Sequence, residues 1–343
     1  MDPAQFFAAS RLVIVAGKGG VGKTTVTATL ASAAARRGLN SLIVEVEGKS
    51  GLASMFGKEP FSYDEVVLAE PSEDGPGAAH GARAAVRART LTPDDALVEY
   101  LQDHAMSRIS RRLMSSGALD MVSTAVPGIR DILVLGKVKQ LERDETADLL
   151  VLDAPAAGHA ITFLQAARGL VDAVRVGPIN TQARDVLEML NDPARCQVML
   201  VTLPEETPVN ELIETAYSLE DKVGVSLGPV VVNGLYPEVG GLDTSAQSAA
   251  EQSGTSLRAG ESGSLQAAAD FRNHRRGLQR AQVERLAERL PLPQLQLPYL
   301  FESEIGPPQL DLLAEALLDG VASLDDASMA QHASPPAGPS GTR

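Results

Sequence analysis

Thiols are almost absent from this chain, which has one cysteine, Cys196, among 343 residues. A single thiol excludes a disulfide within the chain, a zinc site of the CxxC type and a metalloid site built from several cysteines of one subunit. It also excludes a subunit that supplies two cysteine ligands to an iron–sulfur cluster. Functions that need several thiols in one chain are therefore set aside.

Aromatic residues are scarce as well, at 3% with no tryptophan, so the core is expected to consist of Ala, Leu and Val. A net charge of −14 argues against a general attraction to DNA or anionic lipid, and no nucleic-acid partner is expected. No apolar run approaches the ~20 residues that a transmembrane segment needs. The N-terminus lacks the basic-then-apolar order of a signal peptide, which favours a cytoplasmic protein.

The most informative segment that is present is a glycine-rich loop. Residues 17–25 read Gly-Lys-Gly-Gly-Val-Gly-Lys-Thr-Thr, directly after the buried-strand pattern Leu12–Val15 and before a predicted helix that Gly38 ends. Glycines in this spacing let backbone N–H groups approach a polyphosphate at a helix N-terminus. The residues expected to bind a nucleoside triphosphate here are Gly17, Gly19, Gly20, Val21, Gly22, Lys23, Thr24 and Thr25, with Lys23 on the β- and γ-phosphates and the Thr24 hydroxyl on Mg²⁺.

Short runs rich in Val, Ile and Leu alternate with helical stretches along most of the chain. Continuous apolar runs are typical of strands buried on both faces of a parallel sheet, and the β-α-β-α order predicts a doubly wound α/β fold. The predicted strands are Leu12–Val15, Ser41–Glu47, Leu149–Asp153, Val198–Leu203, Pro229–Gly234 and an edge strand at Leu292–Leu297. The clearest predicted helices are Ile161–Ala173, Gln182–Leu190 and Pro208–Lys222.

Residues 58–145 interrupt this pattern and are predicted to form a helical insertion in a P-loop domain made of residues 1–57 and 146–324. Helices are expected to begin near Thr92 and after Gly128, with apolar residues at helical spacing. The segment Gly240–Gly263 is predicted to be a flexible loop, and the tail 325–343 to be disordered.

Carboxylates at strand ends are the candidates for catalysis, because the carboxyl edge of a parallel sheet faces the ligand crevice. Asp153 ends one predicted strand and is expected to act near Mg²⁺. Glu47 ends another and is the candidate for orienting water, with Glu45 as a competitor on the same side of that strand. Asn233 closes a later strand, where its amide can pair with an adenine edge. The alternatives are a helix cap for Asp153, a solvated strand end for Glu47 and a turn residue for Asn233.

These motifs resemble those of one family. Residues 18–25 resemble the deviant Walker A motif of the SIMIBI class of P-loop ATPases. The run Asp-Ala-Pro-Ala-Ala-Gly-His at 153–159 is similar to switch II of the branch that holds ArsA and the ATPases that target tail-anchored membrane proteins. Residues 230–237 resemble that branch's adenine-contacting strand, and 127–131 its Pro-Gly helix start. The resemblance spans roughly residues 11–320 and is closest to short actinobacterial-type homologues.

The resemblance implies an ATP- and Mg²⁺-dependent ATPase that acts as a dimer, either with itself or with a paralogue. Lys18 matches the lysine that crosses to the partner's nucleotide, Lys23 the phosphate lysine and Asp153 the switch II aspartate, with Thr24 and Asp153 at the metal. The insertion would bind a protein client or a membrane-associated partner, and Met106, Ile109 and Leu113 are candidates for its groove or for its core. Glu47 stands where the family has a switch I aspartate, so hydrolysis is expected to be slow.

Two other functions stay open at this point. A partition or septum-placement ATPase of the ParA or MinD kind would need a basic DNA surface or a basic amphipathic end helix, whereas the end helix near Gln309–Leu324 carries acidic residues only. A nucleotide-binding regulatory subunit with little turnover remains compatible with Glu47.

Overall fold

The computed structural model describes residues 1–46, 51–72, 83–103 and 128–324. Its centre is an eight-stranded sheet in the order β3-β4-β2-β5-β1-β6-β7-β8, parallel throughout except for the antiparallel pair β3–β4. The strands are β1 Leu12–Gly17, β2 Ser41–Val46, β3 Val66–Ala69, β4 Val86–Leu91, β5 Leu149–Ala156, β6 Cys196–Thr202, β7 Val230–Leu235 and β8 Gln294–Pro298. The predicted doubly wound α/β fold is confirmed, including an edge strand where the proline-bearing run lies.

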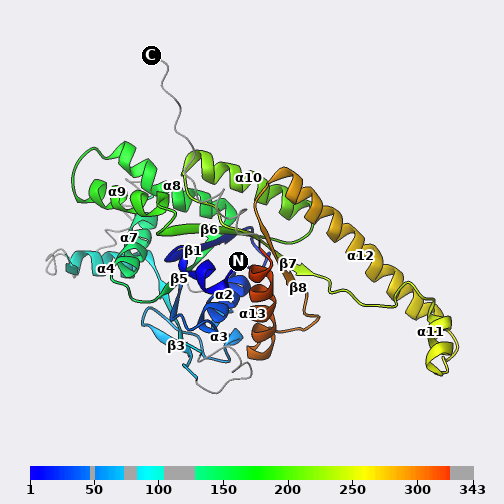
Figure 1. Ribbon diagram of the computed structural model, residues 1–343. Helices are drawn as coiled ribbons and strands as arrows, with labels where there is room; N and C mark the ends of the chain where they lie inside the picture. The colour runs from blue at the N-terminus through cyan, green and yellow to red at the C-terminus, as the bar shows by residue number, and fades with distance from the viewer. Residues whose placement is uncertain (47–50, 73–82, 104–127, 325–343) are drawn as a thin grey trace, which may run out of the picture.

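Helices cover both faces of the sheet (Figure 1). One face packs against α1 Pro3–Ala8, α2 Lys23–Ala35, α3 Leu52–Met55 and α13 Pro307–Ala322. The other packs against α7 Ile129–Arg143, α8 Ala157–Ala173, α9 Pro178–Asn191, α10 Glu206–Lys222 and the C-terminal end of α12 Glu261–Arg289. Two separate apolar layers result, and the central strand β1 is buried along its whole length. The phosphate loop therefore starts from a central strand that is fully buried.

The segment 58–145 is not wholly helical, which corrects the prediction. It contributes β3 and β4 to the main sheet, and β4 pairs in parallel with β2. The pattern in β4 is hidden by two arginines: Arg87 bonds Glu65 at 2.5 Å, and Arg89 stacks on Tyr63. The helices α4 Pro93–Asp103 and α7 begin where predicted, and they pack against each other. Residues 104–127 between them lie outside the described part.

The segment Gly240–Gly263 also differs from the prediction of a flexible loop. It contains α11 Ala246–Ser253, capped by the Ser245 side chain, and the start of α12. α12 runs for 29 residues, of which only Gln279 and Leu286 are buried. With α11 at its tip, the N-terminal half of α12 projects from the body as an arm (Figure 1). A helix with so little buried apolar surface leaves almost no periodic signal in the sequence.

Candidate active site

The glycine-rich loop joins the end of β1 to the start of α2, as predicted. Gly20 and Gly22 have φ values of 86° and 88°, the left-handed region that favours glycine. A Cβ at Gly17 would lie 2.5 Å from the backbone oxygen of Val201, so glycine is needed where β1 and β6 lie side by side. Val21 is buried and anchors the loop, whereas Gly19 and Gly20 are exposed. The loop is thus held at its ends and open at its middle.

Asn233, at the end of β7, braces this loop. Its Nδ2 donates to the backbone oxygen of Val21 at 2.9 Å. A Cβ at Gly22 would lie only 2.3 Å from the same nitrogen. The structure therefore brings Asn233 to the site by contact with the loop itself, and its expected role at an adenine edge stays a prediction.

Thr24 and Asp153 meet beneath the loop. The Thr24 hydroxyl donates to Asp153 Oδ2 at 2.7 Å, and Asp153 is only 7% exposed. Burial raises the pKa of Asp153, while the hydrogen bond from Thr24, the positive charge of Lys23 and the nearby Thr27 hydroxyl oppose that rise. The other carboxylate oxygen, Oδ1, is buried and accepts no hydrogen bond from the described residues. A hydroxyl beside a buried carboxylate with a spare oxygen fits the oxygen-only coordination of Mg²⁺.

The two lysines of the loop take different directions. Lys23 turns its Nζ back to the carbonyl oxygen of Lys18 at 3.2 Å. Burial lowers the pKa of Lys23, and the negative charge of Asp153 counteracts part of that effect. The side chain of Lys18 is 46% exposed and forms an ion pair with Glu211 on α10. Lys23 therefore belongs to the cradle, whereas Lys18 lies on its outer surface.

The candidate for orienting water, Glu47, lies outside the described residues. Its predicted competitor, Glu45, is buried on β2 in register with Asp153 on β5, and it accepts a hydrogen bond from the Thr90 hydroxyl at 3.2 Å. A second carboxylate thus lies beside Asp153 on the same face of the sheet. Thr25 lies in the first turn of α2, and its carbonyl oxygen accepts a hydrogen bond from the Thr29 hydroxyl at 2.7 Å.

The family model described as "Anion-transporting ATPase" (ArsA ATPase) matches residues 10–179, from the start of β1 into α9. The ATPase BagA of Mycobacterium tuberculosis is 32% identical over 306 residues, which cover 84% of this chain and 87% of that protein. The chain belongs to the ArsA ATPase family.

More distant ArsA relatives agree with this assignment. A putative arsenical pump-driving ATPase of Halobacterium salinarum is 27% identical over 92% of this chain, which corresponds to 46% of that protein. The ATPase ASNA1 homolog 1 of Paramecium tetraurelia is 25% identical over 44% of the chain and 42% of its own length. An ATPase of the ArsA type, with an ATP-binding P-loop, is thus the supported activity.

Two contacts at the site had no signal in the sequence. Glu211 is one of several acidic residues on α10, and nothing in its spacing marks it as the partner of Lys18. Thr90 belongs to a strand that sequence reasoning missed. Both residues lie far from the loop in sequence and become neighbours of the site only when the sheet is assembled.

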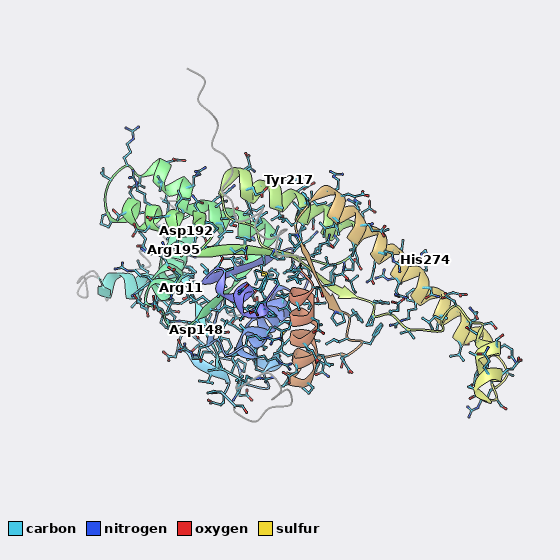
Figure 2. All side chains as sticks on the ribbon, viewed as in Figure 1. Arg11, Asp148, Asp192, Arg195, Tyr217 and His274 are labelled. Atoms are coloured by element: carbon cyan, nitrogen blue, oxygen red, sulfur yellow. The ribbon has the colours of Figure 1, made fainter. Side chains whose placement is uncertain are left out.

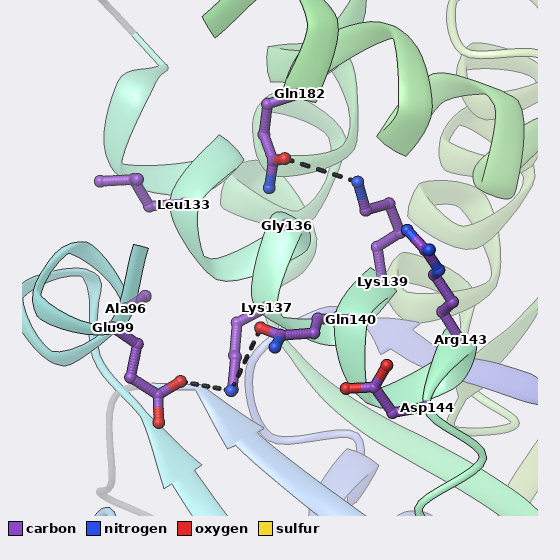
Figure 3. Close-up of a pocket in the computed structure, with 10 residues that line it drawn as sticks. All are labelled: Ala96, Glu99, Leu133, Gly136, Lys137, Lys139, Gln140, Arg143, Asp144 and Gln182. Carbon is purple, nitrogen blue, oxygen red and sulfur yellow. Dashed lines mark hydrogen bonds and ion pairs between the residues drawn. The ribbon is translucent and has the colours of Figure 1, made fainter. Parts of the chain in front are cut away.

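A polar cavity of about 330 Å³ lies apart from the nucleotide loop, between α4, α7 and α9 (Figure 3). Its charges are largely paired: Lys137 contacts Glu99, and Lys139 bonds Asp185 at 2.9 Å. A hydrogen bond from Lys137 and the positive charge of Arg89 hold the pKa of Glu99 below its usual range, although burial pushes it up. The cavity therefore serves as a polar junction of three helices.

None of the helices in the described parts of the chain is both long and apolar enough to cross a membrane. The described residues also contain no cluster of three His, Cys, Asp or Glu side chains suited to a metal ion. A metal at this site would depend on Thr24, Asp153 and the phosphates of the bound nucleotide.

Proposed function

We propose that this ArsA-family ATPase works as a dimeric switch, in which each subunit binds ATP and Lys18 reaches the nucleotide of the other subunit. Two features of the loop support the proposal. Lys18 is exposed on the outer surface of the cradle, and its ammonium group forms a solvent-accessible ion pair with Glu211. Surface ion pairs contribute only about 0–1 kcal/mol, so a partner's phosphate can replace Glu211 at little cost.

The observation that carries the nucleotide site is the buried Thr24–Asp153 pair with its unpartnered oxygen. In the proposed site the loop amides and Lys23 hold the phosphates, while Thr24 and Asp153 hold Mg²⁺, partly through water. Bound Mg²⁺ supplies charge neutralisation at the β- and γ-phosphates. Asp153 is also placed to accept hydrogen bonds from metal-bound water, and Asn233 keeps the loop in register with β7.

Isothermal titration with Mg-ATP and with a slowly hydrolysed analogue tests this site. Wild type should bind only with Mg²⁺, and Lys23→Ala should lose binding. Asp153→Asn should remove the Mg²⁺ dependence. Lys18→Ala should keep nucleotide binding but lose turnover, since it acts on the other subunit's phosphates. Wild type without Mg-dependent affinity, also in the presence of a paralogue, would contradict the proposal.

Slow hydrolysis is the second part of the proposal and depends on Glu47. Glutamate is one methylene longer than the aspartate of the family motif, and a displacement of about 1 Å can cost about 100-fold in rate. Glu47→Asp should therefore raise kcat with little change in KM. An unchanged or lower kcat would favour the alternative, a regulatory subunit with little turnover that completes its site only in a hetero-oligomer with a paralogue.

Client binding is proposed for the segment that α4 and α7 flank. Met106, Ile109 and Leu113 belong to this segment, and methionine-rich apolar helices adapt to variable apolar partners. Exchange of these three residues for polar ones should abolish capture of a protein client or membrane-associated partner while nucleotide binding remains. Loss of folding in that variant, followed by circular dichroism, would assign the three residues to a core.

A further inference from the structure

Gln279 is a buried polar side chain on α12, outside the phosphate loop. Only Gln279 and Leu286 are buried among the 29 residues of this helix, and Gln279 is 5% exposed. It lies where α12 meets the body, whereas His274, labelled in Figure 2, belongs to the projecting part of the helix. Because burial of an amide is costly unless its hydrogen bonds are satisfied, the contacts of Gln279 indicate its role.

Both polar atoms of the Gln279 amide bond to backbone that directly follows Asn233. Its Oε1 accepts a hydrogen bond from the backbone nitrogen of Tyr236 at 2.9 Å. Its Nε2 donates to the backbone oxygen of Gly234 at 3.1 Å. One side chain thus holds two backbone groups that lie two residues apart, and this fixes the conformation of the segment between them.

The sheet does not pair this segment regularly. From Val232 to Leu235 β7 advances three residues, while its partner β8 advances only two, from Gln296 to Pro298. Such a bulge interrupts the ladder of hydrogen bonds and leaves backbone groups to be satisfied elsewhere. Gly234, inside the bulge, has φ of 79°, the left-handed conformation that glycine tolerates. The hydrogen bonds from α12 therefore replace the pairing that the sheet lacks here.

Asn233 belongs to the same bulge and contacts the phosphate loop. Its Nδ2 donates to the backbone oxygen of Val21 at 2.9 Å and lies against Gly22. A continuous series of contacts therefore joins Gln279 to the bulge, and the bulge to the loop that precedes Lys23. The position of the Asn233 amide depends on the conformation of the bulge, and Gln279 holds that conformation.

We propose that Gln279 is a positioning residue for nucleotide binding. It holds the bulge of β7 so that Asn233 keeps the loop amides in the geometry that receives the phosphates. A loop that is already fixed in its bound conformation binds more tightly, because less conformational freedom is lost on binding. The inference rests on the proposed nucleotide site, and it adds that a residue of α12, far from the loop in sequence, sets the affinity of that site.

Titration calorimetry with Mg-ATP, together with turnover measurements, tests this role. Gln279→Met keeps a similar volume but removes both hydrogen bonds. It should weaken the affinity for Mg-ATP about 10-fold, whereas kcat should change little, since no group at the reacting phosphates is altered. Gln282→Ala is the matched control, because Gln282 lies about one turn further along α12 and accepts a hydrogen bond from Arg285 of the same helix. It should bind Mg-ATP like wild type.

The two proposals fail in different ways. Wild-type affinity in folded Gln279→Met would overturn the positioning role and leave the nucleotide site intact. Wild type without affinity for Mg-ATP would contradict the nucleotide site itself.

A double-mutant cycle separates positioning from general stabilisation of the fold. Asn233→Ala should weaken the affinity for Mg-ATP by a similar factor. In that background Gln279→Met should add less than about 2-fold, because the contact with the loop is already lost. Losses that multiply independently would refute the route through Asn233.

Hydrogen exchange of the wild-type protein needs no variant of Gln279. Coupling between two sites is reciprocal, so a bound, slowly hydrolysed ATP analogue should slow exchange of the Tyr236 amide hydrogen several-fold. The same analogue at saturation should have little effect on this hydrogen in Asn233→Ala. Exchange that is unchanged in wild type, or slowed equally in Asn233→Ala, would argue against the coupling.

Discussion

The contact between Gly22 and Asn233 leads to a quantitative prediction about the phosphate loop. Gly22 has φ of 88°, and a Cβ added there would lie 2.3 Å from Asn233 Nδ2. Gly22→Ala therefore combines two costs. Left-handed backbone costs an alanine about 1–2 kcal/mol, and displacement of the amide forfeits its hydrogen bond to Val21, worth about 1 kcal/mol.

The sum is a destabilisation of about 2.5 kcal/mol. With an unfolding entropy of about 2 cal/mol/K per residue, that corresponds to a decrease in Tm of ~4 °C for a domain of this length. Replacement of Asn233 by alanine removes the obstruction. In that background Gly22→Ala should cost only the backbone term, so the double-mutant cycle should give a coupling free energy of about 1 kcal/mol.

Chemical and thermal denaturation of the four chains in the absence of nucleotide provides the measurement. Gly20→Ala is the matched control, since Gly20 is also left-handed but has open space at its Cβ position. It should show the backbone cost with no coupling to Asn233. Additive effects of Gly22→Ala and Asn233→Ala would refute the claim that β7 braces the loop.

Three further variants test the site and its frame. Asp153→Asn should stabilise the nucleotide-free protein by about 1 kcal/mol at neutral pH, because it removes a buried charge with an unpartnered oxygen. The pKa of Asp153 is raised in the folded protein, so the free-energy cost of its charge to folding develops as pH rises from the unfolded-state pKa to the folded-state pKa. The stabilisation by Asp153→Asn should therefore vanish at acid pH. A stabilisation that urea titrations show to be independent of pH would contradict this. Arg195→Leu should lower the free energy of unfolding by about 3 kcal/mol, because buried Glu142 loses its bidentate partner (Arg195 is labelled in Figure 2). The double variant Arg195→Leu/Glu142→Leu should recover much of this loss in denaturation experiments. A double variant no more stable than Arg195→Leu would contradict the role of the pair. Gly17→Ala should cost about 2 kcal/mol and abolish nucleotide binding, as its Cβ would press on the Val201 oxygen; normal affinity in titration calorimetry would show that the strands yield.

The sequence was sufficient for the parts of the fold with continuous apolar runs. The strands at Leu12, Ser41 and Leu149 and the loop glycines follow from local pattern, because each residue's own neighbours in sequence carry the signal. The strand β4 was missed because Arg87 and Arg89 interrupt its apolar pattern, and their compensation by Glu65 and Tyr63 is visible only in three dimensions.

At the candidate site, too, some residues could be predicted from the sequence and others could not. Thr24 and Asp153 were predicted from the motif and the strand end, and the structure brings them into a hydrogen bond. The partners Glu211 and Thr90 were not predictable, because they reach the site from elements that lie far away in sequence. The long helix α12 escaped prediction for another reason. A helix that faces solvent on most sides has no single apolar stripe by which its sequence could be recognised.

The position of β1 has a consequence for biosynthesis. Its neighbours are β5 and β6, whose first residues, Leu149 and Cys196, leave the ribosome long after Leu12. The nascent chain must therefore carry an apolar segment without either hydrogen-bonded neighbour until β5 has been made, and without the second neighbour, β6, until more than half of the protein has been made. Non-local pairing of this kind slows folding and leaves unpaired strand edges exposed to aggregation. A fragment that ends at residue 179 would lack β6, so the phosphate loop would stand at the rim of a truncated sheet.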